Sequence, residues 1–201
     1  MIALIDYGVG NLRSVEKAFE YLGHAIRVTS DPAQIAEAER VILPGVGAFG
    51  AAAKTLREQG LEEVALEAAR SGKPFLGICV GMQLLFDASE ERGTHAGLGL
   101  IPGRVKRFPT APGIKIPQIG WNALHFAKAT PLMAGLDEGA MVYFVHSYYC
   151  APENPEVSAA STEFTLPYCS ALAQGNLFGV QFHPEKSGKV GLKILDNFAR
   201  L

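Results

Sequence analysis

The chain has 201 residues, of which 48% are hydrophobic and 19% charged, and its formal net charge is −2. This length fits one domain, residues 1–201, and the composition is that of a folded globule with a substantial core. The charge balance lacks the basic excess that nucleic-acid binding requires, and no apolar run approaches the roughly 20 residues that span a bilayer. We therefore expect a cytoplasmic protein that binds neither nucleic acid nor a membrane.

In the first half of the chain, short apolar runs alternate with longer amphipathic stretches. That alternation predicts a mostly parallel central sheet flanked by helices, which is an α/β fold. The predicted strands are Met1 to Ile5, Ala25 to Val28, Arg40 to Leu43 and Pro74 to Ile78. The predicted helices are Arg13 to Leu22, Ala51 to Ser71 and Met82 to Ala88.

After Gly97 the pattern changes to strand-like segments separated by Pro and Gly, and a helix is predicted at the end from Val190 to Leu201. Pro109 to Pro117 and the region of Asn154 are expected as surface loops. No internal repeat or flexible linker marks a second domain. The strand-like segments are Arg104 to Phe108, Met141 to Tyr149, Phe164 to Ala173 and Leu177 to Phe182.

A nucleophile candidate stands at the junction between a predicted strand and a predicted helix. The segment from Gly77 to Gly81 places Cys79 between two glycines, in the pattern of a nucleophile elbow with Cys in place of Ser. The positive end of the helix dipole favours a thiolate there, and the N–H of Val80 would face a developing oxyanion. The alternative is that Cys79 is a small buried hydrophobic residue, as free cysteines often are.

A base candidate follows the predicted strand that ends at Phe182. His183 and Glu185 leave this strand together, and Pro184 between them restricts the linkage. A cysteine nucleophile needs an imidazole within reach and a carboxylate that holds the imidazole tautomer, and these two residues can fill the two roles. By itself the motif could be an ordinary turn, so its weight comes from its combination with Cys79.

The segment from Gly45 to Gly50 satisfies the GxGxxG pattern of dinucleotide-binding proteins. That interpretation requires an acidic residue at the end of the next strand, where this chain has Cys79. We prefer a different use of the glycines: their strand should neighbour the elbow, and the N–H of Val46 would give a second oxyanion donor. We hypothesise that the loop Pro44 to Gly47 is the regulated element, because glycine peptides flip at little steric cost.

Metal and cofactor sites are not expected. Cys79, Cys150 and Cys169 are an odd, scattered set without CxxC spacing, which argues against both a zinc site and a disulfide framework. His24 and His95 likewise lack neighbouring ligand types at metal spacing. We therefore predict chemistry that needs only the side chains of the chain itself.

Taken in order, the loop at Pro44, the elbow at Cys79 and the Gly179 to Glu185 segment resemble the class I (triad) glutamine amidotransferases. Further segments, which cover essentially the whole chain, resemble the glutaminase subunits of imidazole glycerol phosphate synthase: Asp6 to Ser14, Pro44 to Phe49, Ile116 to Asn122, Tyr143 to Tyr148 and His183 to Gly188. The resemblance implies glutamine as substrate and a heterodimer with a (β/α)8-barrel cyclase that consumes ammonia in histidine biosynthesis.

The resemblance also implies roles for individual residues. Cys79 would be the nucleophile, His183 the acid and base, and Glu185 the group that orients His183. Two further sets follow from the family pattern: Gly45, Gln83, Ser147 and Tyr148 around the glutamine, and Asn11, Trp121, Asn122 and Tyr143 facing the cyclase.

Other functions remain open. A glutaminase subunit of another synthase, such as anthranilate synthase, would share the triad and differ in its partner surface. A cysteine peptidase or amidase would share the elbow but need no partner. A nucleotide-binding oxidoreductase would retain its function after Cys79→Ala, and a non-catalytic interaction module would retain the triad only by coincidence.

Overall fold

Five parallel strands form the centre of the computed structural model, which describes residues 1–201. Their order is β2–β1–β3–β4–β14, with bounds β1 (Ile2–Ile5), β2 (Ile26–Thr29), β3 (Arg40–Leu43), β4 (Phe75–Ile78) and β14 (Leu177–Val180). Strands β1, β4 and β14 are buried along their whole length, which explains their continuous apolar sequences. The prediction of a central parallel sheet flanked by helices is confirmed for this half of the chain.

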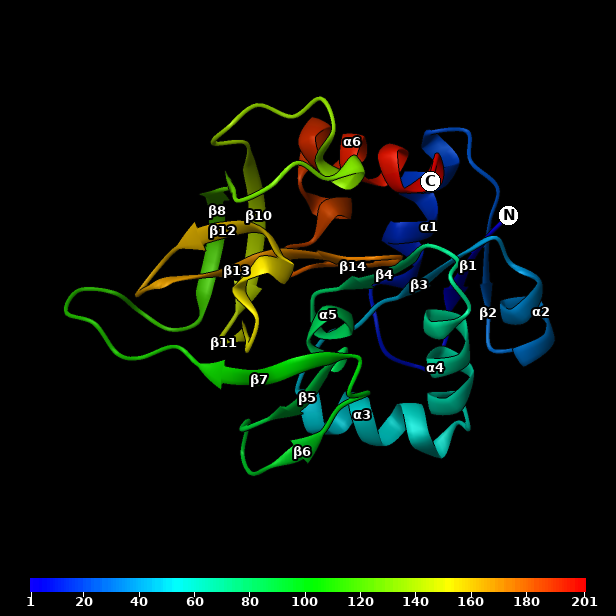
Figure 1. Ribbon diagram of the computed structural model, residues 1–201, viewed down its shortest axis with the longest axis horizontal. Helices are drawn as coiled ribbons and strands as arrows, with labels where there is room; N and C mark the ends of the chain where they lie inside the picture. The colour runs from blue at the N-terminus through cyan, green and yellow to red at the C-terminus, as the bar shows by residue number, and fades with distance from the viewer.

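Helices cover both faces of the parallel strands. In Figure 1, α1 (Leu12–Tyr21) and α6 (Gly188–Ala199) lie on one side of the sheet. On the other side lie α3 (Phe49–Glu58), α4 (Glu62–Arg70) and α5 (Val80–Leu84), and the short α2 (Pro32–Glu37) packs against α4. No helix combines the length and the apolar composition needed to cross a membrane.

Two predicted helices differ from the structure. The stretch from Ala51 to Ser71 forms two helices because the chain turns at Gly60, whose φ of 69° ends the helical path. The helix predicted over Met82 to Ala88 instead ends at Leu84. The following residues form the strand β5 (Phe86–Ser89), which pairs in parallel with β7 (Ile101–Arg107).

Mostly antiparallel strands extend the sheet beyond β14, where β5 and β7 form the one parallel pair. The path continues β13–β11–β7–β5–β6. Strand β12 pairs with β13 and β9 pairs with β12, while β8 and β10 form a separate two-stranded sheet. The bounds are β6 (His95–Ala96), β8 (Gln118–Ala123), β9 (His125–Phe126), β10 (Met141–His146), β11 (Tyr148–Pro152), β12 (Ser158–Glu163) and β13 (Pro167–Gln174). The single strand predicted over Met141 to Tyr149 is therefore two strands, divided at Ser147.

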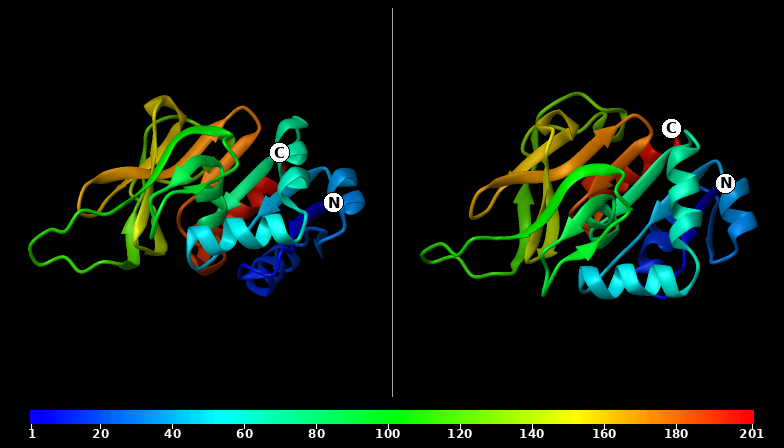
Figure 2. Two further views of the ribbon diagram at one scale, coloured as in Figure 1. Left: turned by 90° about the horizontal axis from the view of Figure 1, so that it is seen from below. Right: turned by 60° about the horizontal axis from the view of Figure 1, so that its bottom comes forward.

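The expected loop from Pro109 to Pro117 joins β7 to β8 and projects from the body of the molecule (Figures 1 and 2). It contains one isolated bridge, between Ala111 and Ile114. The region after Asn154 forms a short 3₁₀ helix, Pro155–Val157, capped by the Asn154 side chain. Both segments connect strands, as the sequence predicted.

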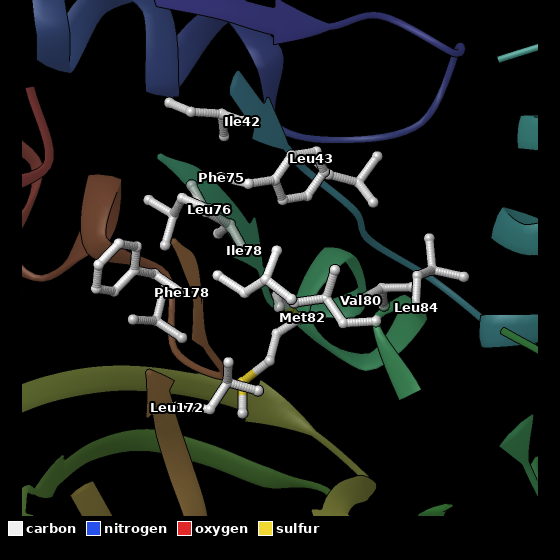
Figure 3. Close-up of a cluster of buried hydrophobic side chains, with 14 of the residues drawn as sticks. Ile42, Leu43, Phe75, Leu76, Ile78, Val80, Met82, Leu84, Leu172 and Phe178 are labelled. Atoms are coloured by element: carbon white, nitrogen blue, oxygen red, sulfur yellow. The ribbon is translucent and has the colours of Figure 1, made fainter. Parts of the chain in front are cut away.

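The core between α5 and the sheet holds the elbow in place. Figure 3 shows Met82 of α5 among the side chains of Ile78, Leu172 and neighbouring apolar residues. Glycines allow this close approach: a Cβ at Gly179 would lie 2.7 Å from the Met82 side chain. A tightly seated α5 therefore fixes the direction in which the turn before it points.

Candidate active site

Cys79 lies at the turn between β4 and α5, at the helix N-cap, and is buried. Its φ of 56° and ψ of −112° are strained for a residue with a Cβ, as a nucleophile elbow requires. Gly81 permits the turn, because a Cβ there would lie 1.9 Å from the carbonyl oxygen of Leu43. The local sequence and the neighbouring strand β3 together impose the strained geometry.

His183 and Glu185 lie beside this elbow because β14 pairs in parallel with β4, with Val180 opposite Ile78. The ring Nδ1 of His183 is 2.8 Å from Oε1 of Glu185, and both side chains are almost fully buried. The carboxylate therefore fixes the tautomer and orientation of the imidazole. Glu185 belongs to a 3₁₀ turn, Pro184–Lys186, that follows directly from the strand.

The backbone of His183 is held from two directions. Its N–H donates to the carbonyl of Tyr143 at 3.0 Å. Its carbonyl accepts a 2.6 Å hydrogen bond from Oγ of the buried Ser187, which in turn accepts from the N–H of Tyr143 at 3.0 Å. The position of the imidazole is thus tied to strand β10.

The charge of the His183 imidazole depends on its two neighbours, Cys79 and Glu185. Burial by itself lowers the pKa of His183, but interactions with Cys79 and Glu185 outweigh it and raise that pKa to about 10. Both neighbours thus favour the protonated, cationic form of His183.

A cavity of about 440 Å³ opens in front of Cys79 and His183. Five of the residues predicted around the substrate or the oxyanion line it, namely Val46, Val80, Gln83, Ser147 and Tyr148. The structure therefore brings together residues from six separate segments of the chain. Its other lining residues are Gly47, Glu91, Pro117, Val145, His146 and Lys186.

Gly45, predicted beside the substrate, is buried and does not line this cavity. A Cβ at this position would lie 2.7 Å from the backbone nitrogen of Gly81, so the absence of a side chain lets the loop pack against the elbow. Gln83 does face the cavity. Its Nε2 donates to the Tyr148 carbonyl at 3.2 Å and to Oε1 of Gln181 at 3.1 Å.

Trp121 and Tyr143, two residues predicted to face a partner, are paired across the two-stranded sheet, with ring centroids 6.2 Å apart. Asn122 alternates to the other face of β8, where its Nδ2 donates to the Glu163 carbonyl at 2.7 Å. The structure thus separates Asn122 from Trp121. The exposed apolar residues of the sheet include Ile119, Trp121, Met141 and Val145.

Two residues at the site have no role in the sequence-based interpretation. Gln181 stands inside the recognised strand segment, but nothing local shows that its amide reaches Cys79. Glu91 lines the cavity, and its Oε2 accepts a 2.7 Å hydrogen bond from the N–H of Phe49. Glu91 follows the strand β5, which was not predicted, so nothing in the sequence indicated this contact.

A buried thiol, an imidazolium and an orienting carboxylate at a cavity can perform nucleophilic acyl transfer. No three His, Cys, Asp or Glu side chains are grouped so that they could hold a metal ion. Fold and site define a class of enzyme: residues 3–201 match the family model "Glutamine amidotransferase class-I". Solved structures agree in fold, including a glutamine amidotransferase that covers 100% of both chains at a TM-score of 0.76 and 20% identity.

Curated relatives narrow the family. The chain is 51% identical to the imidazole glycerol phosphate synthase subunit HisH of Syntrophotalea carbinolica, with 98% of each chain covered. It is 52% identical to HisH of Chlorobium chlorochromatii over the whole of both chains, and 52% identical to that of Moorella thermoacetica over 100% of this chain and 94% of the relative. The chain belongs to the HisH family of class I glutamine amidotransferases.

Proposed function

We propose that the chain hydrolyses glutamine to glutamate and ammonia with Cys79, His183 and Glu185, and passes the ammonia to a cyclase subunit that makes imidazole glycerol phosphate. The observation that carries the proposal is the buried His183–Glu185 pair, 2.8 Å apart, at the cavity into which the Cys79 elbow opens. Family membership gives the substrate and the pathway.

In the first half of the reaction the Cys79 thiolate attacks the carboxamide carbon of glutamine. The N–H groups of Val80 and Val46 stabilise the oxyanion that forms on the amide oxygen. His183 gives its proton to the departing nitrogen, the C–N bond breaks and ammonia leaves. A glutamyl thioester remains on the sulfur.

In the second half, His183 takes a proton from a water molecule that attacks the thioester carbonyl. The C–S bond breaks, its electron pair returns to the sulfur, and glutamate leaves. Glu185 stabilises the imidazolium in both halves through its bond to Nδ1. Ammonia must then reach the partner unprotonated, since ammonium is not a nucleophile.

The cavity can hold the amino-acid end of glutamine. We assign the ammonium group to the carboxylate of Glu91, the one acidic side chain among the lining residues. Gln83 uses its Nε2 in internal bonds, so its Oε1 is free to accept from the substrate. Ser147 and Tyr148 complete the proposed substrate set, and Gly45 contributes by keeping the oxyanion loop close to Gly81.

The exposed face of the β8–β10 sheet is the proposed site for the cyclase. Trp121 is 53% exposed and Ile119 is 63% exposed, which is unusual for large apolar side chains on one small sheet. Val145 belongs to this sheet and also lines the cavity, so the cavity and the proposed docking face are continuous. Ammonia leaving the cavity would therefore emerge under the partner.

We propose three further features of this protein and its complex. They are the (β/α)8-barrel fold of the partner, the cytoplasmic location and the regulatory peptide flip in the loop Pro44 to Gly47. The loop has the freedom that a flip needs, since Gly47 has a φ of 83° and open space around it. Its start is fixed, because the buried Tyr7 hydroxyl donates to the Pro44 carbonyl at 2.8 Å.

Glutamate release from glutamine tests the proposal. It would be measured with the purified chain alone and with the cyclase subunit and its ribonucleotide ligand, using Cys79→Ala as the blank. We expect strong stimulation by the liganded partner and none in the variant. Activity that ignores the cyclase would indicate the glutaminase of another synthase, such as anthranilate synthase, and no activity under any condition would contradict the triad.

A further inference from the structure

Gln181 is a fully buried amide that reaches the proposed nucleophile. It follows β14 directly, and its side-chain Nε2 lies 3.8 Å from the sulfur of Cys79, within the range of an N–H···S hydrogen bond. It does not line the cavity that would hold glutamine. Any role of this side chain in the reaction must therefore act on the sulfur rather than on the substrate.

The direction of the amide is fixed by its other contacts. Oε1 of Gln181 accepts a 3.1 Å hydrogen bond from Nε2 of Gln83, and the thiol of Cys150 lies 4.0 Å from the same oxygen. Since two donors face the oxygen, the NH₂ group must face Cys79. The backbone N–H of Gln181 is bound to the Ser170 carbonyl at 2.9 Å, which keeps the residue in place.

We propose that Gln181 is a catalytic residue whose amide N–H stabilises the Cys79 thiolate. The proposal rests on the proposed role of Cys79 as nucleophile. A buried sulfur anion needs hydrogen-bond donors to offset its loss of hydration, and His183 supplies one of them. Gln181 supplies a second, in a charge-assisted bond that is stronger than one between neutral groups.

The hydrogen bond from Gln181 is most important when the thioester is cleaved. His183 has lost its proton to ammonia and must take another from water before the thioester is cleaved. When the C–S bond then breaks and its electron pair returns to the sulfur, Gln181 already stands beside the new anion. Its position does not depend on the protonation cycle of the imidazole, because Gln83 orients it.

The competing explanation is that Gln181 only fills space and satisfies Gln83. The two explanations differ in what they predict for the sulfur itself. A space-filling amide would change stability but not the pH at which Cys79 becomes reactive. A thiolate donor would change that pH, and raising the pH would restore the lost reactivity.

The test is the rate of Cys79 alkylation by iodoacetamide as a function of pH, followed by peptide mass spectrometry, in the wild-type chain and in Gln181→Met. Gln118→Met is the matched control, because Gln118 is also buried but bonds to Tyr168, 2.9 Å away, instead of to Cys79. We expect the alkylation midpoint to rise by about one pH unit in Gln181→Met, the effect of losing one hydrogen bond to a charged group. The control should keep the wild-type midpoint.

Steady-state glutaminase activity with the partner gives a second readout. For Gln181→Met we expect kcat/KM to fall about tenfold at neutral pH and to recover at higher pH, with KM little changed. An alkylation midpoint in Gln181→Met equal to that of the wild type would overturn the proposal. If wild-type Cys79 is itself unreactive and no glutamate is released, the proposed function fails instead, so the two failures are distinguishable.

Gln181→Glu keeps the test decisive if Gln181→Met does not fold, as judged by circular dichroism. It preserves the volume and the acceptor for Gln83 but replaces the donor with a carboxylate. We expect a larger upward shift of the alkylation midpoint than in Gln181→Met, because a negative group then faces the sulfur. An unshifted midpoint in a folded Gln181→Glu would overturn the proposal equally.

Discussion

Asn11 donates a 3.0 Å hydrogen bond from Nδ2 to Oε1 of Glu185, the same oxygen that holds His183. Asn11 occupies the N-cap of α1, yet its side chain makes no cap hydrogen bond there. Its Oδ1 instead accepts from Oγ of Ser14 at 2.9 Å. A residue of the first loop, which the sequence assigned to the partner surface, is thus bound directly to the proposed triad.

Replacing Asn11 by Ala should lower activity without unfolding the chain. Glu185 would lose one of its two donors, and its other oxygen, Oε2, already lacks a partner. We expect kcat/KM for glutamine to fall about tenfold, in line with the worth of a hydrogen bond to a charged group. In Ser14→Ala, which leaves the hydrogen bond from Asn11 to Glu185 in place, kcat/KM should fall much less. Equal losses of kcat/KM in the two variants would exclude a direct effect on Glu185.

Trp121→Ala should weaken binding to the cyclase subunit while leaving the fold intact. A large exposed aromatic residue in an apolar patch is the type of residue that dominates interface energies, typically by about 2 kcal/mol or more. We expect at least a tenfold rise in Kd by isothermal titration calorimetry. Tyr21→Ala is the control, because Tyr21 is 80% exposed but lies on α1, away from the two-stranded sheet; a similar loss there would argue against the proposed docking face.

Gly81→Ala should destabilise the chain severely. Its Cβ would lie 1.9 Å from the Leu43 carbonyl oxygen, so either β3 or the elbow must move. We expect a loss of about 3 kcal/mol or more in the free energy of unfolding, measured by urea denaturation. Gly113→Ala has open space around its Cβ and only a positive φ of 76° to accommodate, so its cost should stay near about 1 kcal/mol.

Acid should destabilise the protein through His146. Burial, together with the nearby charge of His183, lowers the pKa of His146 to about 4, while a hydrogen bond to the Tyr148 carbonyl opposes this shift. Between pH 6.5 and 4 the unfolded chain therefore binds more protons at this residue than the folded chain. Stability should fall over that window, by roughly 3 kcal/mol in total.

His146→Gln isolates this effect. Glutamine can still donate to the Tyr148 carbonyl, and its amide can lie beside the Tyr168 hydroxyl, which is 3.3 Å from the ring Nε2 of His146. Denaturation midpoints measured from pH 7 to 4 should decline less steeply in the variant than in the wild type. An equally steep decline in the variant and the wild type would show that groups other than His146 control the loss of stability in acid.

His183 should make the stability of the folded chain fall at alkaline pH. Its folded pKa of about 10 lies above its ordinary value of 6.5, so its stabilising contribution is complete below pH 6.5 and is lost as pH rises towards 10. Glu185→Gln weakens the hydrogen bond and the charge interaction that support this shift. We expect a flatter alkaline limb of stability in that variant. His125→Gln, which removes an exposed pair with Glu138, should leave the limb unchanged.

Local patterns in the sequence were sufficient for the main elements of the parallel half. The apolar runs Pro74 to Ile78 and Leu177 to Phe182 are short and interrupted by few polar residues, and the structure has strands there, the second of which ends at Val180. The turn at Cys79 also follows from local chemistry, because small neighbours at Gly77 and Gly81 are what a tight strand-to-helix turn needs. Such features depend on residues that are neighbours in the chain.

Pairing between segments that are distant in the chain determined the features that the sequence did not predict. The helix after Cys79 ends early because the residues from Phe86 onward pair with β7, a contact that no local propensity reports. For the same reason Gly45 lies under the elbow instead of at the cavity wall. Side-chain orientation in a strand depends on register, which only the neighbouring strand fixes.

The composition of the site shows the same division. The sequence suggested Cys79, His183 and Glu185 as the proposed triad by type and order, but it could not place them together, since that requires β14 to lie beside β4. It gave no role to Gln181, whose amide reaches the sulfur only because the parallel pairing brings the ends of these two strands to one edge. The sequence by itself thus determined which chemical groups the chain can offer. The distances and directions between these groups were decided only by the tertiary structure, because they depend on how the segments pack.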